Sequence, residues 1–227
     1  MLTTHRSFDS IVSSYEELAA TALLNLHMEV RCRTAYSLRV ALDPKTAPYL
    51  LDQDVKEPDP QILSLNSELL AYDETIVRFL REREVAFIRT GLGLLINSFL
   101  IANASTVAPI NARGSGRMQL NILVLQQNLK NIEAGVDMAR AANYWALFDG
   151  GADAIVTKAK EDAAKAAEEN SVPIGRDPDR FTYDELKALI ELCYSESLAS
   201  AERGNVNAAK RNMADRLLEL SEHMWQS

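Results

Sequence analysis

The chain has 227 residues, of which 47% are hydrophobic and 25% charged, a balance typical of a soluble globular protein. Its net charge of −8 argues against nucleic-acid binding, which needs a basic surface. Two cysteines, Cys32 and Cys193, are too few for a disulfide framework. Their helical surroundings predict small packing residues in a reducing compartment. The N-terminus lacks the apolar segment of a secretory signal peptide.

Residues 8–42 show helical periodicity and predict one long helix. Its expected inner face carries Ile11, Tyr15, Leu18, Ala22, Leu26 and Val30. Prolines at 44 and 48 end this helix, and an acidic, proline-bearing connection follows. Asp59 and Pro60 predict the next helix start, because Asp suits an N-cap and Pro is tolerated in the first turn.

Residues 60–107 predict a second long helix. Between Leu92 and Ile101 it is apolar nearly all round, which indicates burial by neighbours on several sides. Gly91 and Gly93 lie inside it, each costing about 1 kcal/mol relative to Ala, so they either admit another backbone or mark a bend. The uncharged run 90–111 is long enough to cross a membrane, but Pro109 and several Asn and Ser residues favour a buried core helix.

Residues 118–148 predict a third helix with one clean apolar stripe at alternating spacings of four and three. The stripe consists of Met118, Ile122, Leu125, Leu129, Ile132 and Val136. Pro109 and residues 113–116 (RGSG) are expected to form the break before it. The core is therefore expected to be an antiparallel hairpin within residues 85–136, with the apolar run of the second helix as its central arm and the striped third helix lining it. Gly150 and Gly151 predict the stop of the third helix.

Residues 152–170 predict an Ala-rich, exposed helix with ion pairs Lys158–Asp162 and Lys165–Glu169. Residues 171–180 are expected to be a linker. The chain thus divides into a helical bundle region over residues 1–170, which contains the core hairpin, and a C-terminal helical pair over 181–227 packed on the same rod.

The C-terminal pair begins at a capping box of Thr182 and Glu185, which predicts a helix to about residue 201. Its expected inner face carries Leu186, Leu189, Ile190, Cys193 and Tyr194, and that of the last helix carries Val206, Ala209, Met213, Leu217, Leu220 and Met224. No segment shows strand alternation. The predicted fold is all-α, an elongated stack of antiparallel helical bundles with about six helices, two of them long.

Motifs that carry chemistry are missing from the sequence. His5, His27 and His223 do not lie at metal-ligand spacing from another His or Cys, and His27 is interpreted as a surface or capping contact. The glycines at 91 and 93 lack the strand and third glycine of a dinucleotide site, and residues 113–117 lack the Lys-Ser/Thr of a P-loop. These patterns predict no metal, no cofactor and no enzymatic activity.

Basic residues gather in the centre of the chain, where residues 75–132 hold seven Lys and Arg against two Glu. One interpretation is solvated faces and intramolecular pairing. The other is a surface for a partner or an anionic lipid. The arginines of that hypothetical contact are Arg78, Arg81, Arg83, Arg89, Arg113 and Arg117.

Three segments, residues 25–38 (NLHMEVRCRTAYSL), 87–96 (FIRTGLGLLI) and 121–132 (NILVLQQNLKNI), resemble the C-terminal region of the exocyst complex component 4 family, the Sec-eight subunit. Residues 144–156 and 181–192 match more loosely, so the resemblance covers roughly residues 15–200. Because that family's subunit is much longer, the resemblance implies a C-terminal fragment or a truncated product.

The resemblance implies a non-catalytic subunit of a hetero-octamer, built from rod-like helical bundles, that tethers secretory vesicles to the plasma membrane before fusion. Its partners would be other exocyst subunits, together with small-GTPase or SNARE-related regulators. It would be cytoplasmic and recruited peripherally to the plasma membrane at sites of polarised secretion. Two alternatives stay open: a peripheral module that binds anionic membranes or a regulator through the six arginines, and a small-molecule or enzymatic helical domain.

Overall fold

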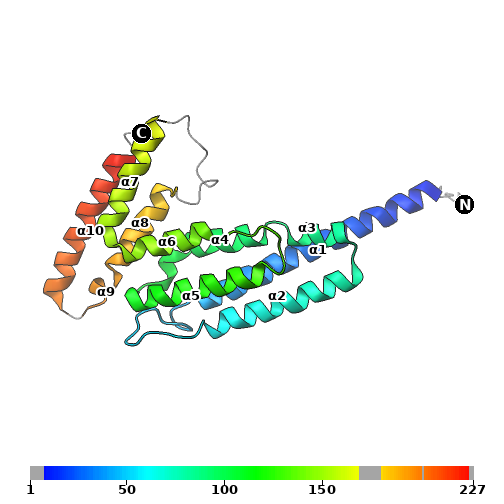
Figure 1. Ribbon diagram of the computed structural model, residues 1–227, viewed down its shortest axis with the longest axis horizontal. Coiled ribbons are helices and arrows are strands. Elements are labelled where there is room, and N and C mark those ends of the chain that lie inside the picture. Colours follow the sequence, from blue (N-terminus) through cyan, green and yellow to red (C-terminus); the bar gives the residue numbers. More distant parts are fainter. Residues whose placement is uncertain (1–7, 169–179, 201, 225–227) are drawn as a thin grey trace, which may run out of the picture.

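The structure, a computed structural model, describes residues 8–168, 180–200 and 202–224. In these residues all regular elements are helices, and an isolated parallel bridge joins Tyr49 to Ile110. Figure 1 shows long helices lying side by side along the long axis and a second group crossing one end. The predicted all-α, elongated class is therefore confirmed.

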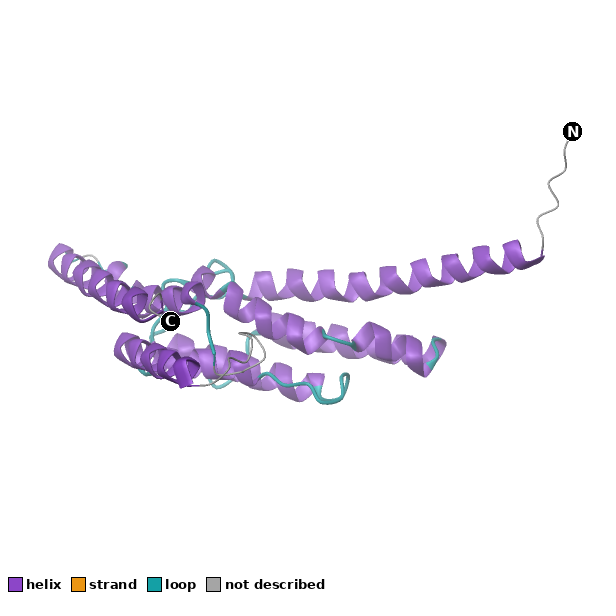
Figure 2. Cartoon of the chain, turned by 90° about the horizontal axis from the view of Figure 1, so that it is seen from above, coloured by secondary structure: helices purple, strands orange, loops and turns teal. Residues whose placement is uncertain are grey.

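Six helices form the main bundle, and they share one continuous core with the C-terminal helices. They are α1 (Phe8–Ala41), α2 (Pro60–Phe79), α3 (Glu82–Arg89), α4 (Leu92–Ala102), α5 (Ala112–Leu129) and α6 (Ala139–Asp149). Helix α1 packs on α2, α3 and α4, while α5 packs on α2 and α6. Figures 1 and 2 show the N-terminal part of α1 running past the ends of the other helices.

The prediction of one continuous helix over residues 60–107 is wrong. This segment is divided into α2, α3, α4 and the short 3-10 helix η1 (Ala104–Val107). Gly91 adopts φ +80°, which ends the α-helical path between α3 and α4. The carbonyls of Ile88 and Thr90 that this break frees accept hydrogen bonds from the Arg31 guanidinium of α1. The break is stable because a distant side chain satisfies these carbonyls.

The backbone N–H groups at the start of α4 also form hydrogen bonds with a side chain that is distant in sequence. The two carboxylate oxygens of Glu133 accept from the N–H groups of Gly91 at 2.7 Å and Gly93 at 2.8 Å. An anion at a helix N-terminus also interacts favourably with the helix dipole. Gly93 allows a close approach as well, since a Cβ there would lie 2.1 Å from Val136 Cγ2. Gly91 thus marks the bend, and Gly93 admits a side chain rather than another backbone.

The third helix, predicted over residues 118–148, begins and ends at other residues in the structure. Helix α5 begins at Ala112, where the Asn111 side chain accepts from the Gly114 N–H at 3.0 Å, so residues 113–116 are helical and the predicted loop there is wrong. The helix ends at Leu129, and residues 130–138 connect it to α6. The stripe from Met118 to Leu129 is buried as predicted, and Ile132 is buried from the connection instead.

The apolar segment Glu82–Ala102 is long and apolar enough to cross a membrane, and 44% of its most apolar window is buried. Core helices of soluble proteins have the same properties. The segment is interrupted at Gly91, and α4 packs on both α1 and α6. These contacts agree with the prediction of a core helix. The predicted hairpin of this segment with the striped helix is wrong, because α5 packs on α2 and α6 rather than on α4.

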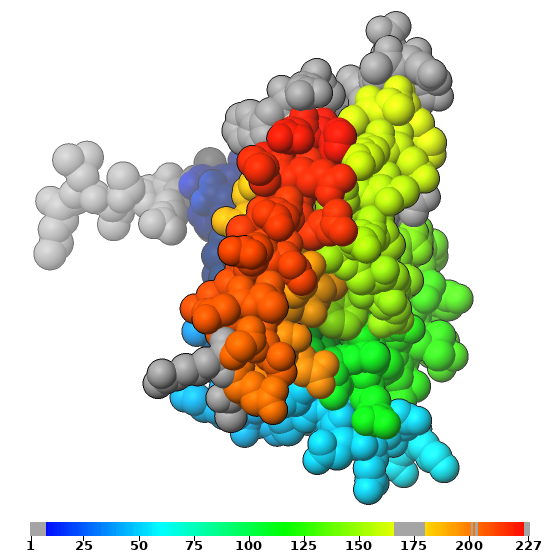
Figure 3. Space-filling model, turned by 90° about the vertical axis from the view of Figure 1, so that its left-hand side faces the viewer, coloured from blue at the N-terminus to red at the C-terminus, as the bar shows by residue number. Residues whose placement is uncertain are grey.

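The C-terminal helices form the second group seen in Figure 1: α7 (Gly151–Glu168), α8 (Tyr183–Cys193), α9 (Ser195–Leu198) and α10 (Arg203–Met224). Figure 3 shows α10 lying beside α7, and both helices pack on α8. The prediction of an exposed 152–170 helix is wrong, because Ile155, Val156 and Ala159 are buried in this group. Their spacing of one, three and four residues places them on one helix face.

Local signals in the C-terminal half are mostly confirmed. The capping box of Thr182 and Glu185 is present, the Lys158–Asp162 pair measures 2.8 Å, and Gly151 follows α6 with φ +75°. Helix α8 is shorter than predicted and ends at Cys193. The Lys165–Glu169 pair and nearly all of the predicted linker lie outside the described residues. The division into regions 1–170 and 181–227 stays a prediction, and α7 packs with the helices of the second region.

Candidate partner-binding surface

The N-terminal part of α1 carries apolar side chains without covering helices. Every residue from 8 to 22 is exposed, and we call this stretch the overhang. Phe8 is 79% exposed, Tyr15 70% and Leu18 63%, whereas Val30, farther along the predicted inner face, is 4% exposed. The face predicted to be core is therefore exposed as far as Ala22, partly buried at Leu26 and buried at Val30. The overhang presents an apolar stripe with the spacing of a helix–helix seam.

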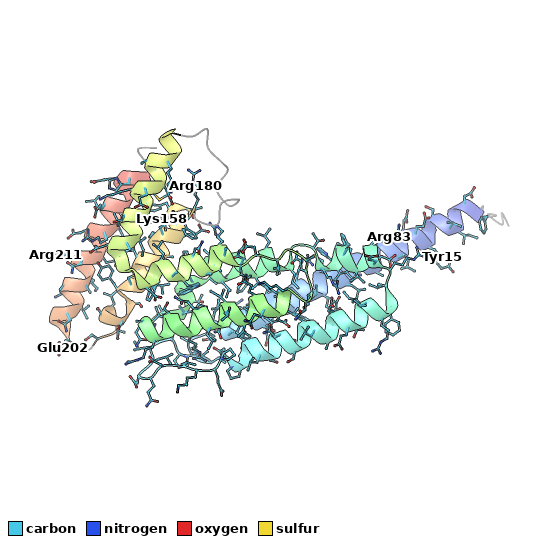
Figure 4. All side chains as sticks on the ribbon, viewed as in Figure 1. Tyr15, Arg83, Lys158, Arg180, Glu202 and Arg211 are labelled. Carbon is cyan, nitrogen blue, oxygen red and sulfur yellow. The ribbon has the colours of Figure 1, made fainter. Side chains whose placement is uncertain are left out.

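A groove of about 710 Å³ lies at the base of the overhang. We call residues 77–84, which comprise the end of α2, the two-residue connection and the start of α3, the corner. Apolar side chains line the groove from both sides, Leu23 and Leu26 from α1 and Leu80 and Phe87 from the corner and α3. Figure 4 shows Tyr15 on the overhang, beyond the level of Arg83 in α3. On α1 the groove lies along the face of Glu16 and Leu23, which continues to the buried Val30 at spacings of seven residues.

The inner end of the groove is fixed by contacts between α1 and its neighbours. The His27 ring stacks on Phe87 at 4.6 Å between centroids, and its Nδ1–H donates to the Phe87 carbonyl at 3.0 Å. The Tyr72 hydroxyl donates to the Leu26 carbonyl at 2.8 Å. His27 thus makes an interhelical surface contact, in agreement with its predicted role.

Charge is distributed unevenly over this surface. The overhang holds Asp9, Glu16 and Glu17, and no Lys, Arg or His occurs between residues 8 and 26. Asp9 and Glu16 are seven residues apart, so they lie on the same flank of the stripe. Across the groove, Arg83 is exposed, and the groove is lined by Glu16 on one side and Arg83 on the other.

The six arginines of the sequence-based hypothesis lie in two separate places. Arg78, Arg81 and Arg83 are exposed near the corner, at the end of α2. Arg113 pairs with the exposed Asp54 at 3.1 Å, near the start of α2. Because α2 has 20 residues, the two groups are separated by about 30 Å, one helix length. They do not form one continuous patch.

The other two arginines make internal contacts. Arg89 binds Asp73 through two hydrogen bonds of 2.7 Å, a bidentate geometry that joins α3 to α2. Arg117 lies 2.8 Å from the carboxylate of Asp59 and 5.5 Å over the ring of Tyr49. These two side chains hold elements of the bundle together.

The Arg117–Asp59 pair is part of a buried polar cluster at the start of α2. The Asp59 N–H donates to the Asn121 side chain at 2.8 Å, and Arg117 donates to the Pro48 carbonyl at 3.1 Å. Burial raises the pKa of Asp59, and the nearby Arg117 opposes that shift. Burial likewise raises the pKa of Tyr49. The cluster anchors the 43–59 connection to α5.

Neither a metal-ligand cluster nor a reactive buried thiol is found in the described part of the chain. No group of three or more His, Cys, Asp or Glu residues there is placed to hold a metal ion. Burial raises the pKa of the Cys193 thiol to about 12, so it is not a thiolate at neutral pH. Cys32 is exposed, which corrects its predicted role as a packing residue.

The apolar stripe of α1 was predicted to be buried in the core, but its N-terminal part is exposed. The residues themselves were found by their periodicity, but periodicity does not tell whether a neighbour of the same chain covers them. Val77 at the corner was not singled out, and Phe79, predicted to lie on the apolar inner face of the second helix, is 76% exposed. Phe79 is the last residue of α2, a position that only the observed helix end reveals.

Comparisons with known proteins give one consistent result. Over 99% of its length, the chain is 59% identical to the Neurospora crassa protein named "Probable exocyst complex component sec8". It is 29% identical to the human exocyst complex component 4 over 72% of its length, and 32% identical to the Drosophila melanogaster protein of that name over 64%. No protein-family model matches the chain.

The chain spans 22% of the Neurospora protein and 17% and 15% of the human and Drosophila proteins. The relatives come from fungi and animals, and all three carry names of the same exocyst component. The all-helical architecture agrees with the fold that the sequence resemblance implied. The chain is therefore a homologue of the exocyst complex component 4, or sec8, proteins.

Proposed function

We propose that the chain is a non-catalytic helical module of the exocyst, which tethers secretory vesicles to the plasma membrane before fusion. The observation that carries this proposal is the 59% identity to the Neurospora sec8 protein over 99% of the chain. In this proposal its partners are other exocyst subunits in a hetero-octamer, with small-GTPase or SNARE-related regulators. It acts in the cytoplasm and reaches the plasma membrane peripherally.

The architecture suits a structural role in such an assembly. Long helices packed around one core form a stiff rod, and α1 extends this rod beyond the bundle. Arg89–Asp73 joins the consecutive helices α3 and α2, and Arg140–Glu185 joins α6 to α8, each through a 2.7 Å hydrogen bond. A stiff rod of this kind holds partners that bind its two ends at a fixed distance and orientation.

The test is an affinity pull-down of the tagged, folded chain from a fungal extract, with bound proteins identified by mass spectrometry. We expect several exocyst subunits to be recovered at moderate salt. The matched control is a Leu125→Asp variant, whose buried charge disrupts the core. Recovery of no exocyst subunit by a chain with native circular dichroism would contradict the proposal.

A second candidate function is peripheral binding of anionic membranes. The observation in its favour is the exposure of Arg78, Arg81 and Arg83 at one corner of the bundle. Cosedimentation with phosphatidylserine vesicles should then be lost on reversal of these three charges and retained in Arg113→Glu, which changes the other end of α2. Equal binding by both variants would reject the corner as a lipid site.

A further inference from the structure

The side of α1 that lines the groove carries a largely apolar row of residues, which we call the groove face. Its residues recur at alternating spacings of four and three: Val12, Glu16, Ala19, Leu23, Leu26 and Val30. The four from Glu16 to Leu26 line the groove. Helices of the same chain cover only the inner end of this face, because Val30 is buried whereas Val12 and Ala19 are exposed. The outer part of the groove face therefore has the spacing of a helix–helix contact without a covering helix.

The two walls of the groove carry opposite charges. Glu16 lies on the α1 wall and Arg83 on the wall formed by the corner. Neither takes part in an ion pair within the part of the chain that the structure describes. The other charged residue that lines the groove, Glu84, accepts a hydrogen bond from the Arg81 N–H at 3.0 Å. The occupant that complements this groove therefore brings an anion to Arg83 and a cation to Glu16.

A second copy of the chain, lying antiparallel to the first, supplies both charges and an apolar helix. With a two-fold axis at Ala19, Val12 of each copy stands at the level of Leu26 of the other, because both lie seven residues, about 10 Å, from that point. Glu16 of each copy likewise stands at the level of Ala22 of the other, in the groove that Arg83 lines. Each contact occurs twice in such a pair, so both grooves are filled and both charges are matched.

The shape of the molecule leaves room for this arrangement. Figures 1 and 2 show the overhang running past the ends of the other helices. Two copies joined antiparallel through their overhangs therefore place their bundles on opposite sides of the axis. Small side chains at the crossing point, those of Ala19, Ala20 and Ala22, allow the two helices to approach closely. The contact is also closed, because two copies cover each other and leave no groove for a third.

We propose that the groove is occupied by the overhang of a second copy, so that the chain forms an antiparallel, two-fold dimer through the groove face. This inference goes beyond the proposed function, which concerns other exocyst subunits. Its test uses only the purified chain and its variants, so its failure and the failure of the proposed function are distinguishable.

Sedimentation velocity from about 1 µM to about 300 µM covers the weak affinities typical of a small interface. We expect the mass to rise with concentration from 25.2 kDa toward twice that value. Ala19→Glu sets two like charges beside the two-fold axis and should weaken the dimer about tenfold or more. The matched control is Thr21→Glu, which adds the same charge on the opposite side of α1 and should associate like the unaltered chain. Both positions are exposed, so both variants should keep the native melting temperature.

Charge reversal then distinguishes a contact between copies from one within a chain. Glu16→Arg meets the unaltered Arg83 of the other copy, and Arg83→Glu meets the unaltered Glu16, so each variant alone should associate about tenfold more weakly or worse. An equimolar mixture of the two variants should regain the dimer, because both contacts of a mixed pair again join opposite charges. Within each chain of the mixture the two residues still carry like charges, so an intramolecular contact cannot produce this recovery.

Three results would overturn the proposal. A chain that stays at 25.2 kDa over the whole concentration range would leave a partner of another sequence as the occupant of the groove. A dimer that Ala19→Glu does not weaken would place the association on another surface. Charge variants that remain monomeric after mixing, with native circular dichroism, would exclude the reciprocal contact of Glu16 with Arg83.

Discussion

Gly114 and Gly116 lie two residues apart in α5, and replacing each by Ala should have opposite effects on stability. At Gly114 a Cβ would lie 1.9 Å from the carbonyl oxygen of Tyr49 and 2.9 Å from Cγ1 of Ile110. At Gly116 a Cβ would meet no atom within 4 Å. One glycine is therefore required by packing, and the other only weakens the helix.

The magnitudes follow from two competing terms. Ala is favoured over Gly in a helix by about 1 kcal/mol, and Gly116→Ala should gain that amount. At Gly114 the obstacle is backbone rather than a flexible side chain, so the cost lies near the upper end of the roughly 1–3 kcal/mol of overpacking. The net loss of unfolding free energy for Gly114→Ala is then about 2 kcal/mol. In a chain of this size 1 kcal/mol corresponds to about 2–4 °C in Tm.

Thermal unfolding followed by circular dichroism measures both variants. We expect the Tm of Gly114→Ala to fall by about 4–8 °C and that of Gly116→Ala to rise by about 2–4 °C. Gly116→Ala also serves as the control for any general effect of Ala in α5. An equal rise in Tm for both variants would refute the close packing of the residue 49 backbone on α5.

Four further predictions concern single groups. Glu133→Ala removes the acceptor of two helix-start N–H groups, so we expect a loss of about 2 kcal/mol in urea unfolding, with no loss contradicting the capping role. Leu125→Asp places a charge at a fully buried position and should abolish cooperative unfolding; a native Tm would show that this residue faces solvent. Iodoacetamide should alkylate Cys32 and leave Cys193 largely unmodified in the native chain, as peptide mass spectrometry would show, and equal labelling would contradict the burial that raises the Cys193 pKa. Because burial raises the pKa of Asp59 above its ordinary value of about 4, the native state holds this proton more tightly than the unfolded state. The stability of the unaltered chain relative to Asp59→Asn should therefore rise as the pH falls from 7 toward about 4, and a constant difference would contradict the shift.

The helix starts were predictable because their signals are local. Thr182 and Glu185 form a capping box within the first turn of α8, and Pro60 stands in the first turn of α2, so both starts lie where the sequence indicates. The Asp59 side chain makes no capping hydrogen bond and pairs with Arg117 instead. The stop at Gly150 is equally local. Each of these signals acts within one turn of backbone and needs no distant partner.

The break at Gly91 was not predictable from the same rules. A continuous helix satisfies its own backbone, so periodicity favours continuity through residues 60–107. The interrupted path is stable only because Arg31 and Glu133, which lie 57 and 42 residues away from their respective partners Ile88 and Gly91, supply the missing hydrogen bonds. No window around Gly91 contains these side chains.

Residues 113–116 show the opposite error. Two glycines and a serine in four residues are typical of a loop, yet they form the first turns of α5. Gly114 is explained by the Tyr49 backbone that lies against it, a contact across 65 positions of the chain. The low helix propensity of this stretch is offset by packing of the 43–59 connection.

The sequence by itself determined the helical class, most helix starts and the identity of the apolar faces, because these depend on hydrogen bonds and spacing within a few residues. Only the tertiary structure decided which apolar faces are covered. The predicted stripe of α1 runs from Ile11 to Val30, but it is exposed as far as Ala22 and becomes buried only at its end. Burial is a property of neighbours brought together by the fold, so the same pattern forms core at Val30 and an open surface at Tyr15.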